Sequence, residues 1–287
     1  MSTIEIRPIA TLAAAQQTAL IQRALGVNSE SDWLPPALML SVHHNGGLCL
    51  GASDAEQVVG FAFGLISLIP SGDRIDPVAA ARLKLYLRAL AVAPDYQGRG
   101  IGQQLFLGVR DYALRLGLRL VTWALDPLLS QPAWLSIGKM GGISSGFQPW
   151  RASSSVAPPA DFLEVEWWVT NNRVQRRTMR PRQALNLTAF LGGGGVIVNT
   201  TSLDDTDQAA PPATFLDDNG NVILVEIPHD FGRLQAHAWP LVDAWRTHVR
   251  AVLEHYFHKG YFITDFVRHR TDILPERDFY VLAHRDA

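Results

Sequence analysis

The sequence predicts an α/β protein with a mixed sheet, and three observations support this. Residues 83–92 and 118–125 have strand patterns and flank a glycine-rich turn followed by a helix. The chain has 287 residues, 47% of them hydrophobic, which suffices for a substantial core in one large domain or two small ones. Its longest apolar run, residues 58–69, is too short to span a membrane as a helix and is typical of a buried strand.

Charge and cysteine usage limit the partners and the compartment. The formal net charge of −2 gives no general attraction for nucleic acid or for an anionic membrane. The single cysteine, Cys49, excludes an internal disulfide and suits a reducing compartment. The start, MSTIEIRPI, lacks the basic and apolar regions of a signal peptide. We therefore expect a soluble cytoplasmic protein with no nucleic-acid or membrane partner; the oligomeric state cannot be predicted.

The glycine-rich turn has the sequence QGRGIG and covers residues 97–102. An apolar pattern with helical spacing begins at Ile101 and continues to Leu116, where Gly117 is suited to end the helix. The first amides of a helix lack partners within the helix and lie at the positive end of its dipole. Glycines at this point remove the side chains that would block an anion, so the turn predicts a diphosphate site.

Two other glycine-rich phosphate sites can be compared with this turn. A Walker A loop ends in Gly-Lys-Ser/Thr, whereas Gly102 is followed by two glutamines. The dinucleotide fingerprint G-x-G-x-x-G would need a third glycine in place of Gln103, and it also needs an acidic residue after the next strand. Asp126 lies near that place, so the dinucleotide alternative is weakened but stays open.

Gln97, Gly100 and Gly102 resemble the Q/R-x-x-G-x-G/A signature of the GNAT superfamily of N-acetyltransferases. Residues 90–92 precede the signature, where that family has a splayed central strand. The resemblance extends over residues 1–170. It includes strands over residues 4–9, 47–51, 58–68 and 162–169, and a helix over 132–139 that is followed by two glycines.

The resemblance implies acetyl-CoA as the acetyl donor. Its pyrophosphate would bind the amides of Gln97, Gly98, Arg99, Gly100, Ile101 and Gly102, and its pantetheine arm would lie along Leu90, Ala91 and Val92. The implied reaction is acetyl transfer to an amine, most simply of a small molecule, by direct attack in a ternary complex. The alternative is a non-catalytic module that binds or senses acetyl-CoA.

Acetyl transfer needs a polarised thioester carbonyl, an unprotonated amine and a proton for the leaving thiolate. A backbone N–H near Val92 could polarise the carbonyl. Asp126 follows the strand of residues 118–125 and is the candidate general base or ammonium ligand; its alternative role is capping the next helix. The resemblance implies a tyrosine as general acid, but Ile137 occupies the matching position and has no proton to give.

Several further patterns favour structural roles. Glu164 and Glu166 share one face of a strand, where solvent exposure is the expected environment. Residues 142–146 match G-x-S-x-G, but a helix precedes them, which is the reverse of a hydrolase nucleophile turn. His255 and His258 are three residues apart with no third ligand nearby, so no metal site is predicted. An arginine cluster is expected to be a solvated connector or, alternatively, a phosphate contact: Arg173, Arg176, Arg177, Arg180 and Arg182.

The second half predicts a connector over residues 171–213 and a C-terminal α/β region over 214–287. In that region we expect a hairpin over 215–227 with its turn at Asn219-Gly220, a helix over 239–259, and strands over 261–267 and 279–282. The order strand, helix, glycine, strand, strand repeats that of residues 118–169. The region is therefore a candidate partial GNAT-like half without a cofactor site, and chance recurrence of a common α/β pattern is the alternative.

Overall fold

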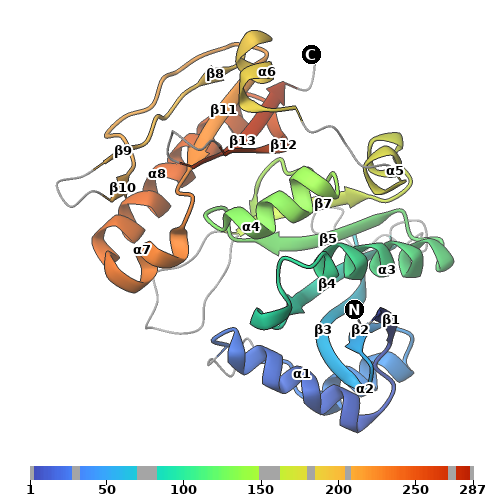
Figure 1. The fold of residues 1–287 in the computed structure, drawn as a ribbon. Coiled ribbons are helices and arrows are strands. Elements are labelled where there is room, and N and C mark those ends of the chain that lie inside the picture. The colour runs from blue at the N-terminus through green and yellow to red at the C-terminus, as the bar shows by residue number, and fades with distance from the viewer. Residues whose placement is uncertain are drawn as a thin grey trace. The chain divides into compact units, whose positions relative to one another are not determined.

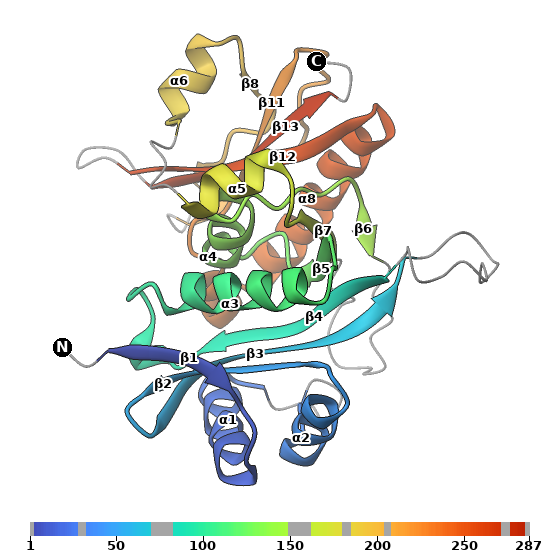
Figure 2. The ribbon, with the colours of Figure 1, turned by 90° about the vertical axis from the view of Figure 1, so that its right-hand side faces the viewer.

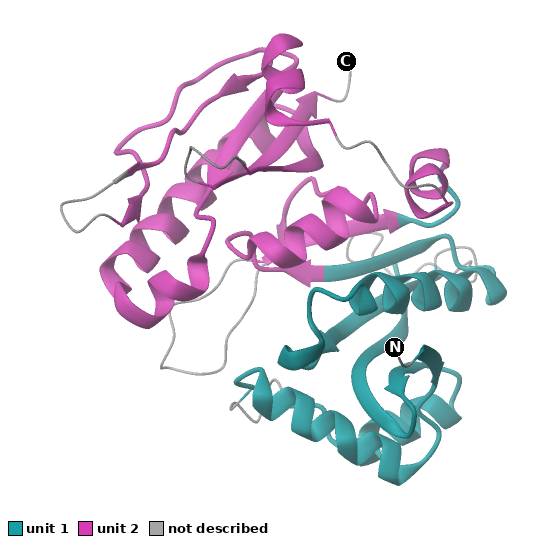
Figure 3. Cartoon of the chain, viewed as in Figure 1, with its two compact units in different colours: residues 1–123, 168–171 teal, residues 124–167, 172–287 magenta. Residues whose placement is uncertain are grey.

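The computed structural model describes residues 3–27, 33–69, 83–148, 162–179, 185–203, 208–270 and 276–284 (Figure 1). The chain divides into two compact units (Figure 3). Unit 1 contains residues 1–123 and 168–171, and unit 2 contains residues 124–167 and 172–287. The α/β class with a mixed sheet in the N-terminal part is confirmed, and a second sheet lies in the C-terminal part.

Unit 1 is built on strands in the order β1-β2-β3-β4-β5. The first four are antiparallel neighbours, whereas β5 runs parallel to β4, which makes the sheet mixed. The elements are β1 Ile4–Pro8, α1 Leu12–Ala24, α2 Pro36–His44, β2 Leu48–Asp54, β3 Gln57–Leu68, β4 Leu83–Val92, α3 Ile101–Arg115 and β5 Leu120–Leu125, whose last two residues belong to unit 2. The strand and helix predictions for this region are confirmed, and Gly117 follows α3 with φ of 70°.

The sheet of unit 1 is covered on both faces, by α3 on one and by α1 and α2 on the other (Figure 2). Because successive strand residues point to opposite faces, β2 contributes Cys49 to the cluster under α1 and α2, where it meets Phe61 and Phe63. On the opposite face, Gly108 lets α3 approach the sheet closely: a Cβ there would lie 3.0 Å from Leu50 Cδ1. This close packing fixes the position of the N-terminus of α3 relative to β4.

Unit 2 contains a sheet of strand order β12-β13-β11-β8 and several helices. Strand β11 is parallel to β8 and antiparallel to β13, which in turn is antiparallel to β12. The elements are α4 Ser130–Ala133, which continues as a π-helix over Trp134–Lys139, β6 Phe147–Gln148, β7 Phe162–Trp168, α5 Asn172–Met179, α6 Leu187–Gly192, β8 Val196–Ile197, β9 Ser202–Leu203, β10 Ala209–Ala210, β11 Val222–Ile227, α7 Phe231–His237, α8 Trp239–His258, β12 Tyr261–His269 and β13 Arg277–His284. Residues 171–213, expected to be a connector, thus include two helices and three short strands.

The hairpin prediction over residues 215–227 is wrong. Strand β11 forms its ladder with β13 and β8, not with the residues before Asn219. The backbone before the turn is held elsewhere, because Leu216 N–H donates to the Val198 carbonyl at 2.8 Å and the Leu216 carbonyl accepts from Tyr256 Oη at 2.9 Å. The predicted long helix and the two strands after it are confirmed as α8, β12 and β13. The proposal that this region is a partial GNAT-like half stays a prediction.

Candidate functional site

The glycine-rich turn in unit 1 joins β4 to α3. Gly98 and Gly100 have φ of 76° and 80°, in the left-handed region that favours glycine. An ideal Cβ built on either residue would have no heavy atom within 4 Å, so neither glycine is required by packing. The turn therefore has an open outer surface next to the N-terminus of a 15-residue helix.

The backbone amides of this turn are available to a ligand. The exception is Gln97, whose N–H donates to the Pro94 carbonyl at 3.1 Å and is therefore not free for the pyrophosphate, contrary to the expectation for this residue. Gln104 N–H donates to the Gly100 carbonyl at 3.1 Å, and within the described part of the chain no backbone bond is made by the amides of residues 98–103. The neighbouring side chains bond backward instead. Gln97 Nε2 donates to the Val92 carbonyl at 3.1 Å, and Arg99 Nη2 donates to the Asp95 carbonyl at 2.6 Å. Backbone N–H groups at the positive end of a helix thus make up an anion site.

Strand β4 leads into this turn and separates from β5. The two strands pair at Leu85–Val121 and Tyr86–Thr122, and β4 then continues to Val92. Ala93 N–H donates to the Val59 carbonyl of β3 at 2.9 Å. Because bonded and non-bonded positions alternate in an antiparallel pair, the N–H groups of Leu90 and Val92 point away from β3. These two donors face the side on which β5 has separated from β4.

Asp126, the candidate catalytic carboxylate, lies in unit 2 just after β5. Its Oδ1 accepts a hydrogen bond from Leu128 N–H at 3.0 Å, and its Oδ2 pairs with Arg246 Nη2 of α8 at 2.9 Å. The side chain of Asp126 is 13% exposed. Asp126 closes a turn rather than capping α4, whose N-cap residue, Leu129, makes no side-chain cap bond. Its ion-pair partner Arg246 could not be identified from the sequence.

Ile137, at the position of the expected general acid, is fully buried within the π-helix. The carbonyls of Ile137 and Gly138 accept hydrogen bonds from Arg177 Nη1 at 2.6 and 3.0 Å. Arg177 Nη2 also pairs with Asp265 Oδ2 at 2.9 Å. An arginine from α5 therefore binds two carbonyls of the π-helix, and that of Ile137 also accepts from Gly141 N–H at 3.1 Å. This supports the structural interpretation of Arg177; Arg180 and Arg182 lie outside the described residues.

The remaining patterns have structural contacts. Glu164 and Glu166 are half-buried on one face of β7, less exposed than expected. Ser144 is buried in a β-bridge to Ile263, which is incompatible with an exposed nucleophile turn. His255 pairs with Asp217 at 2.9 Å. Within the part of the chain that the structure describes, no group of three or more His, Cys, Asp or Glu could hold a metal ion, and no helix is long and apolar enough to cross a membrane.

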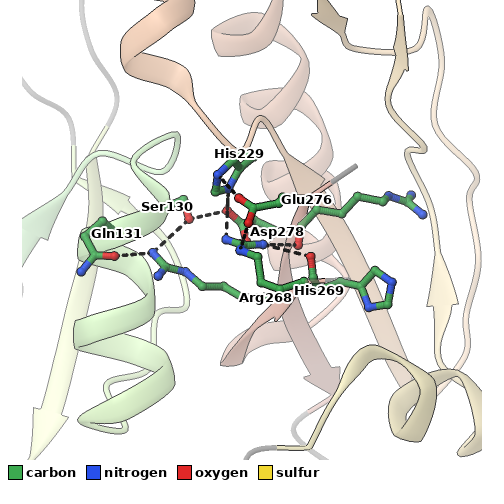
Figure 4. Close-up of polar contacts among 9 residues, drawn as sticks. Ser130, Gln131, His229, Arg268, His269, Glu276 and Asp278 are labelled. Atoms are coloured by element: carbon green, nitrogen blue, oxygen red, sulfur yellow. Dashed lines mark hydrogen bonds and ion pairs between the residues drawn. The ribbon is translucent and has the colours of Figure 1, made fainter. Parts of the chain in front are cut away.

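Sequence reasoning missed a polar cluster in unit 2 (Figure 4). Asp278 is fully buried, accepts a hydrogen bond from Ser130 Oγ and lies 3.0 Å from His229 Nδ1, which is also 3.0 Å from Arg270 Nη2. Arg270 Nη2 pairs with the same carboxylate at 2.7 Å, and Glu276 pairs with His229 Nε2. These residues come from α4, the loop before α7 and the two ends of the β12–β13 connection. The alternation of Glu276 and Asp278 on one side of a strand start was the only local signal.

Comparisons with known proteins bear on the N-terminal part of the chain. Residues 16–135 match a family model described as the acetyltransferase (GNAT) family. No match was found among curated proteins.

Three solved structures illustrate the likeness of fold. A diaminobutyrate acetyltransferase from Paenibacillus lautus, in complex with L-2,4-diaminobutyric acid and coenzyme A, is 16% identical, with a TM-score of 0.46 over 60% of this chain and 99% of that one. A putative acetyltransferase from Salmonella typhimurium with acetyl-CoA is 17% identical, with a TM-score of 0.44 over 59% and 95%. A putative acetyltransferase from Acinetobacter baylyi is 16% identical, with a TM-score of 0.47 over 63% and 98%.

The family assignment rests on the matched residues and not on these distant structures. The match contains the glycine-rich turn, all of β4 and α3, and both Asp126 and the start of α4. Over residues 16–135, this chain belongs to the GNAT acetyltransferase family.

Proposed function

We propose that the protein is an N-acetyltransferase that uses acetyl-CoA to acetylate the amine of a small-molecule acceptor by direct attack in a ternary complex. The observation that carries the proposal is the turn between β4 and α3. Gly98 and Gly100 have left-handed backbones with open space beyond them, and the following helix presents amides without backbone partners among the described residues.

The pyrophosphate of acetyl-CoA is assigned to the amides of residues 98–102, since the Gln97 N–H is bonded to the Pro94 carbonyl. A diphosphate carries several negatively charged oxygens, and the turn offers N–H donors together with the positive end of the α3 dipole. The side chains of Gln97 and Arg99 bond to the preceding backbone, so they leave the outer surface to the ligand. Recognition by backbone also explains why glycine is needed at positions 98 and 100.

The pantetheine arm and the thioester are assigned to residues 90–92. Leu90 and Val92 present N–H groups away from β3, and an extended arm with amide carbonyls can accept hydrogen bonds from such a strand. The Val92 carbonyl is already occupied by Gln97, whereas its N–H points to the open side. We assign that N–H to the thioester carbonyl, where it would stabilise the oxyanion that develops when the amine attacks.

Asp126 is the candidate residue for the acceptor amine. As general base through water, or as a charge that orients the ammonium group before deprotonation, it would act on the acceptor and not on the coenzyme. Arg246 Nη2 pairs with the carboxylate at 2.9 Å and fixes its direction. Asp126 therefore has a structural role in unit 2 beside the proposed chemical one, and the two have to be separated by experiment.

The coenzyme site can be tested with a matched pair of substitutions at the two ends of α3. Gly100 and Gly117 both have positive φ, 80° and 70°, and open space at the Cβ position. Gly100→Asp and Gly117→Asp therefore impose similar backbone strain, but only the first places a carboxylate beside the assigned pyrophosphate. Calorimetric titration with acetyl-CoA should show binding by Gly117→Asp and none by Gly100→Asp. Equal affinities in the two variants would remove the turn from the coenzyme site.

A non-catalytic module that binds or senses acetyl-CoA is the second candidate. The observation in its favour is Ile137, which has no ionisable group and is fully buried at the position expected for a general acid. A panel of small amines, with release of free coenzyme A thiol as the readout, distinguishes the two functions. Tight coenzyme binding without turnover of any amine would favour the sensing module.

A further inference from the structure

Unit 2 contains a cavity of about 370 Å³, a volume within the range of small-molecule sites. The segment before β9, the end of β11, the start of α7 and the start of β13 form its walls. None of its lining residues belongs to the glycine-rich turn or to β4. The cavity is therefore distinct from the coenzyme site proposed above.

The floor of the cavity is a fixed ion pair. Glu226 is 2% exposed, and its two carboxylate oxygens accept from Arg277 Nε and Nη2, each at 2.7 Å. The Thr201 N–H also donates to Glu226 Oε2, at 2.9 Å. Asn199 in turn exchanges two hydrogen bonds with the backbone of Glu226. A buried charge held by this many donors is built into the fold, so the floor does not need to rearrange when a ligand enters.

Two polar groups of the lining lack partners within the described part of the chain. The Thr201 Oγ1 atom is buried and has no hydrogen-bond partner there. The Arg233 side chain is exposed at the cavity, and its guanidinium makes no ion pair with a described residue. A buried hydroxyl without a partner is unfavourable unless water or a ligand bonds to it. An unpaired guanidinium is the preferred protein group for a carboxylate.

A negatively charged group, a carboxylate, is found at another part of the cavity lining. Glu276 pairs with His229 Nε2 through one carboxylate oxygen and with Arg270 Nε, at 3.4 Å, through the other, and its side chain remains 47% exposed (Figure 4). His229 Nδ1 is oriented by the buried Asp278 at 3.0 Å. The imidazole and the guanidinium hold the Glu276 carboxylate in place, and because it is half-exposed its remaining lone pairs can accept hydrogen bonds from an ammonium group. Ile227, Pro228 and Leu234 are buried and provide an apolar wall of the cavity.

The charged lining contains groups of both signs. It contains three carboxylates, Glu226, Asp230 and Glu276, and two guanidiniums together with one imidazole. Such a lining does not favour a strongly anionic or cationic ligand, but it provides separate contacts for groups of both signs. We propose that this cavity binds a free amino acid, with its carboxylate on Arg233, its ammonium group on Glu276 and its side chain on the apolar wall.

The test is binding of the common L-amino acids, screened singly by thermal shift and then measured by calorimetry, without acetyl-CoA. At least one should bind, and its carboxamide and its decarboxylated amine should each bind at least about tenfold more weakly. Arg233→Ala and Glu276→Gln should each weaken binding about tenfold, whereas Arg250→Ala, on the exposed face of α8, should not. Both cavity residues are exposed, so neither substitution should prevent folding.

Three results would overturn the proposal: no amino acid binds, the decarboxylated amine binds as tightly as the amino acid, or both cavity variants bind like the wild type. Gly100→Asp provides the link to the coenzyme site. Its amino-acid binding should equal that of the wild type even though its acetyl-CoA binding is lost. The proposed coenzyme site and the proposed amino-acid site can therefore each be rejected independently of the other.

Discussion

The two units of this protein use their polar groups in opposite ways. In unit 1 the amides of the glycine-rich turn and of the end of β4 are directed outward, and the ion pair between Arg7 and Glu56 is exposed at 44% and 97%. In unit 2, arginines pair with buried carboxylates. The pair of Arg177 and Asp265 is exposed at only 7% and 9%, and that of Arg246 and Asp126 at 16% and 13%.

This difference follows from what each kind of group can do. Backbone N–H groups at a helix start remain in place without a partner, because the helix fixes them, so they can wait for an anionic ligand. A buried guanidinium cannot be left without a partner, because its desolvation is too unfavourable. Unit 1 therefore carries the features of a ligand site in its backbone, whereas the charged side chains of unit 2 mainly hold the unit together.

The largest expected effect is on stability, when a buried pair of unit 2 is broken. Arg177→Met leaves the carboxylate of Asp265 buried without its partner and removes the donors to the Ile137 and Gly138 carbonyls. We expect the free energy of unfolding to fall by about 3–5 kcal/mol, measured by urea denaturation. Arg7→Met in unit 1 should cost less than about 1 kcal/mol.

A double substitution serves as the control. Adding Asp265→Asn to Arg177→Met removes the uncompensated charge and should recover part of the lost stability. If Arg177→Met costs no more than Arg7→Met, the distinction between the two units is wrong. If the double variant is no more stable than Arg177→Met alone, the charge is not the cause.

The second prediction concerns Asp126, which lies where the chain passes from one unit to the other. Asp126→Asn keeps the shape of the side chain and removes its charge. If the carboxylate acts on the acceptor, turnover should fall about 100-fold while the affinity for acetyl-CoA is unchanged. The measurement is steady-state turnover with an acceptor found in the amine screen, beside calorimetry for the coenzyme.

Substitution of Arg246 provides the matched control, because it breaks the same ion pair by removing the guanidinium instead of the carboxylate. Arg246→Gln should lower stability about as much as Asp126→Asn, since each leaves one charge of a mostly buried pair. A purely structural Asp126 predicts equal turnover in the two variants, per folded molecule. A turnover loss confined to Asp126→Asn would assign the carboxylate to the transfer reaction.

Much of unit 1 could be predicted because its signals are local. The strand ending before Pro94, the three glycines and the apolar spacing after Ile101 lie within 35 residues of one another, and their structure depends on backbone rules that act over a few residues. The residues predicted to bind the coenzyme, 90–92 and 97–102, lie at the end of β4 and in the turn before α3, and their role stays a prediction.

The parts that could not be predicted depend on partners far away in sequence. Asn219-Gly220 has the sequence of a hairpin turn, but Asp218 and Tyr256 satisfy the backbone around it, and Tyr256 lies on α8. The π-helix carbonyls of Ile137 and Gly138 accept from Arg177, which lies 40 residues after Ile137. The partner of Asp126 is 120 residues away. No local pattern contains these pairs, so the surroundings of Asp126 and Ile137 could not be predicted from the sequence.

The smallest expected effect is on the pH dependence of stability, and it comes from a buried group of unit 1. Cys49 of unit 1 lies among apolar side chains, and this burial raises the pKa of its thiol to about 12. The unfolded chain releases the thiol proton near pH 9, whereas the folded protein retains it, so stability should fall as the pH rises above 9. The loss due to this thiol is at most about 1.4 kcal/mol for each pH unit.

Cys49→Ala lowers stability at every pH by leaving a small cavity, but it should remove the part of the pH dependence that is due to the thiol. Urea denaturation of both proteins from pH 8 to 10 measures the difference, and parallel pH dependences would show that the thiol of Cys49 is not what makes unit 1 sensitive to alkali.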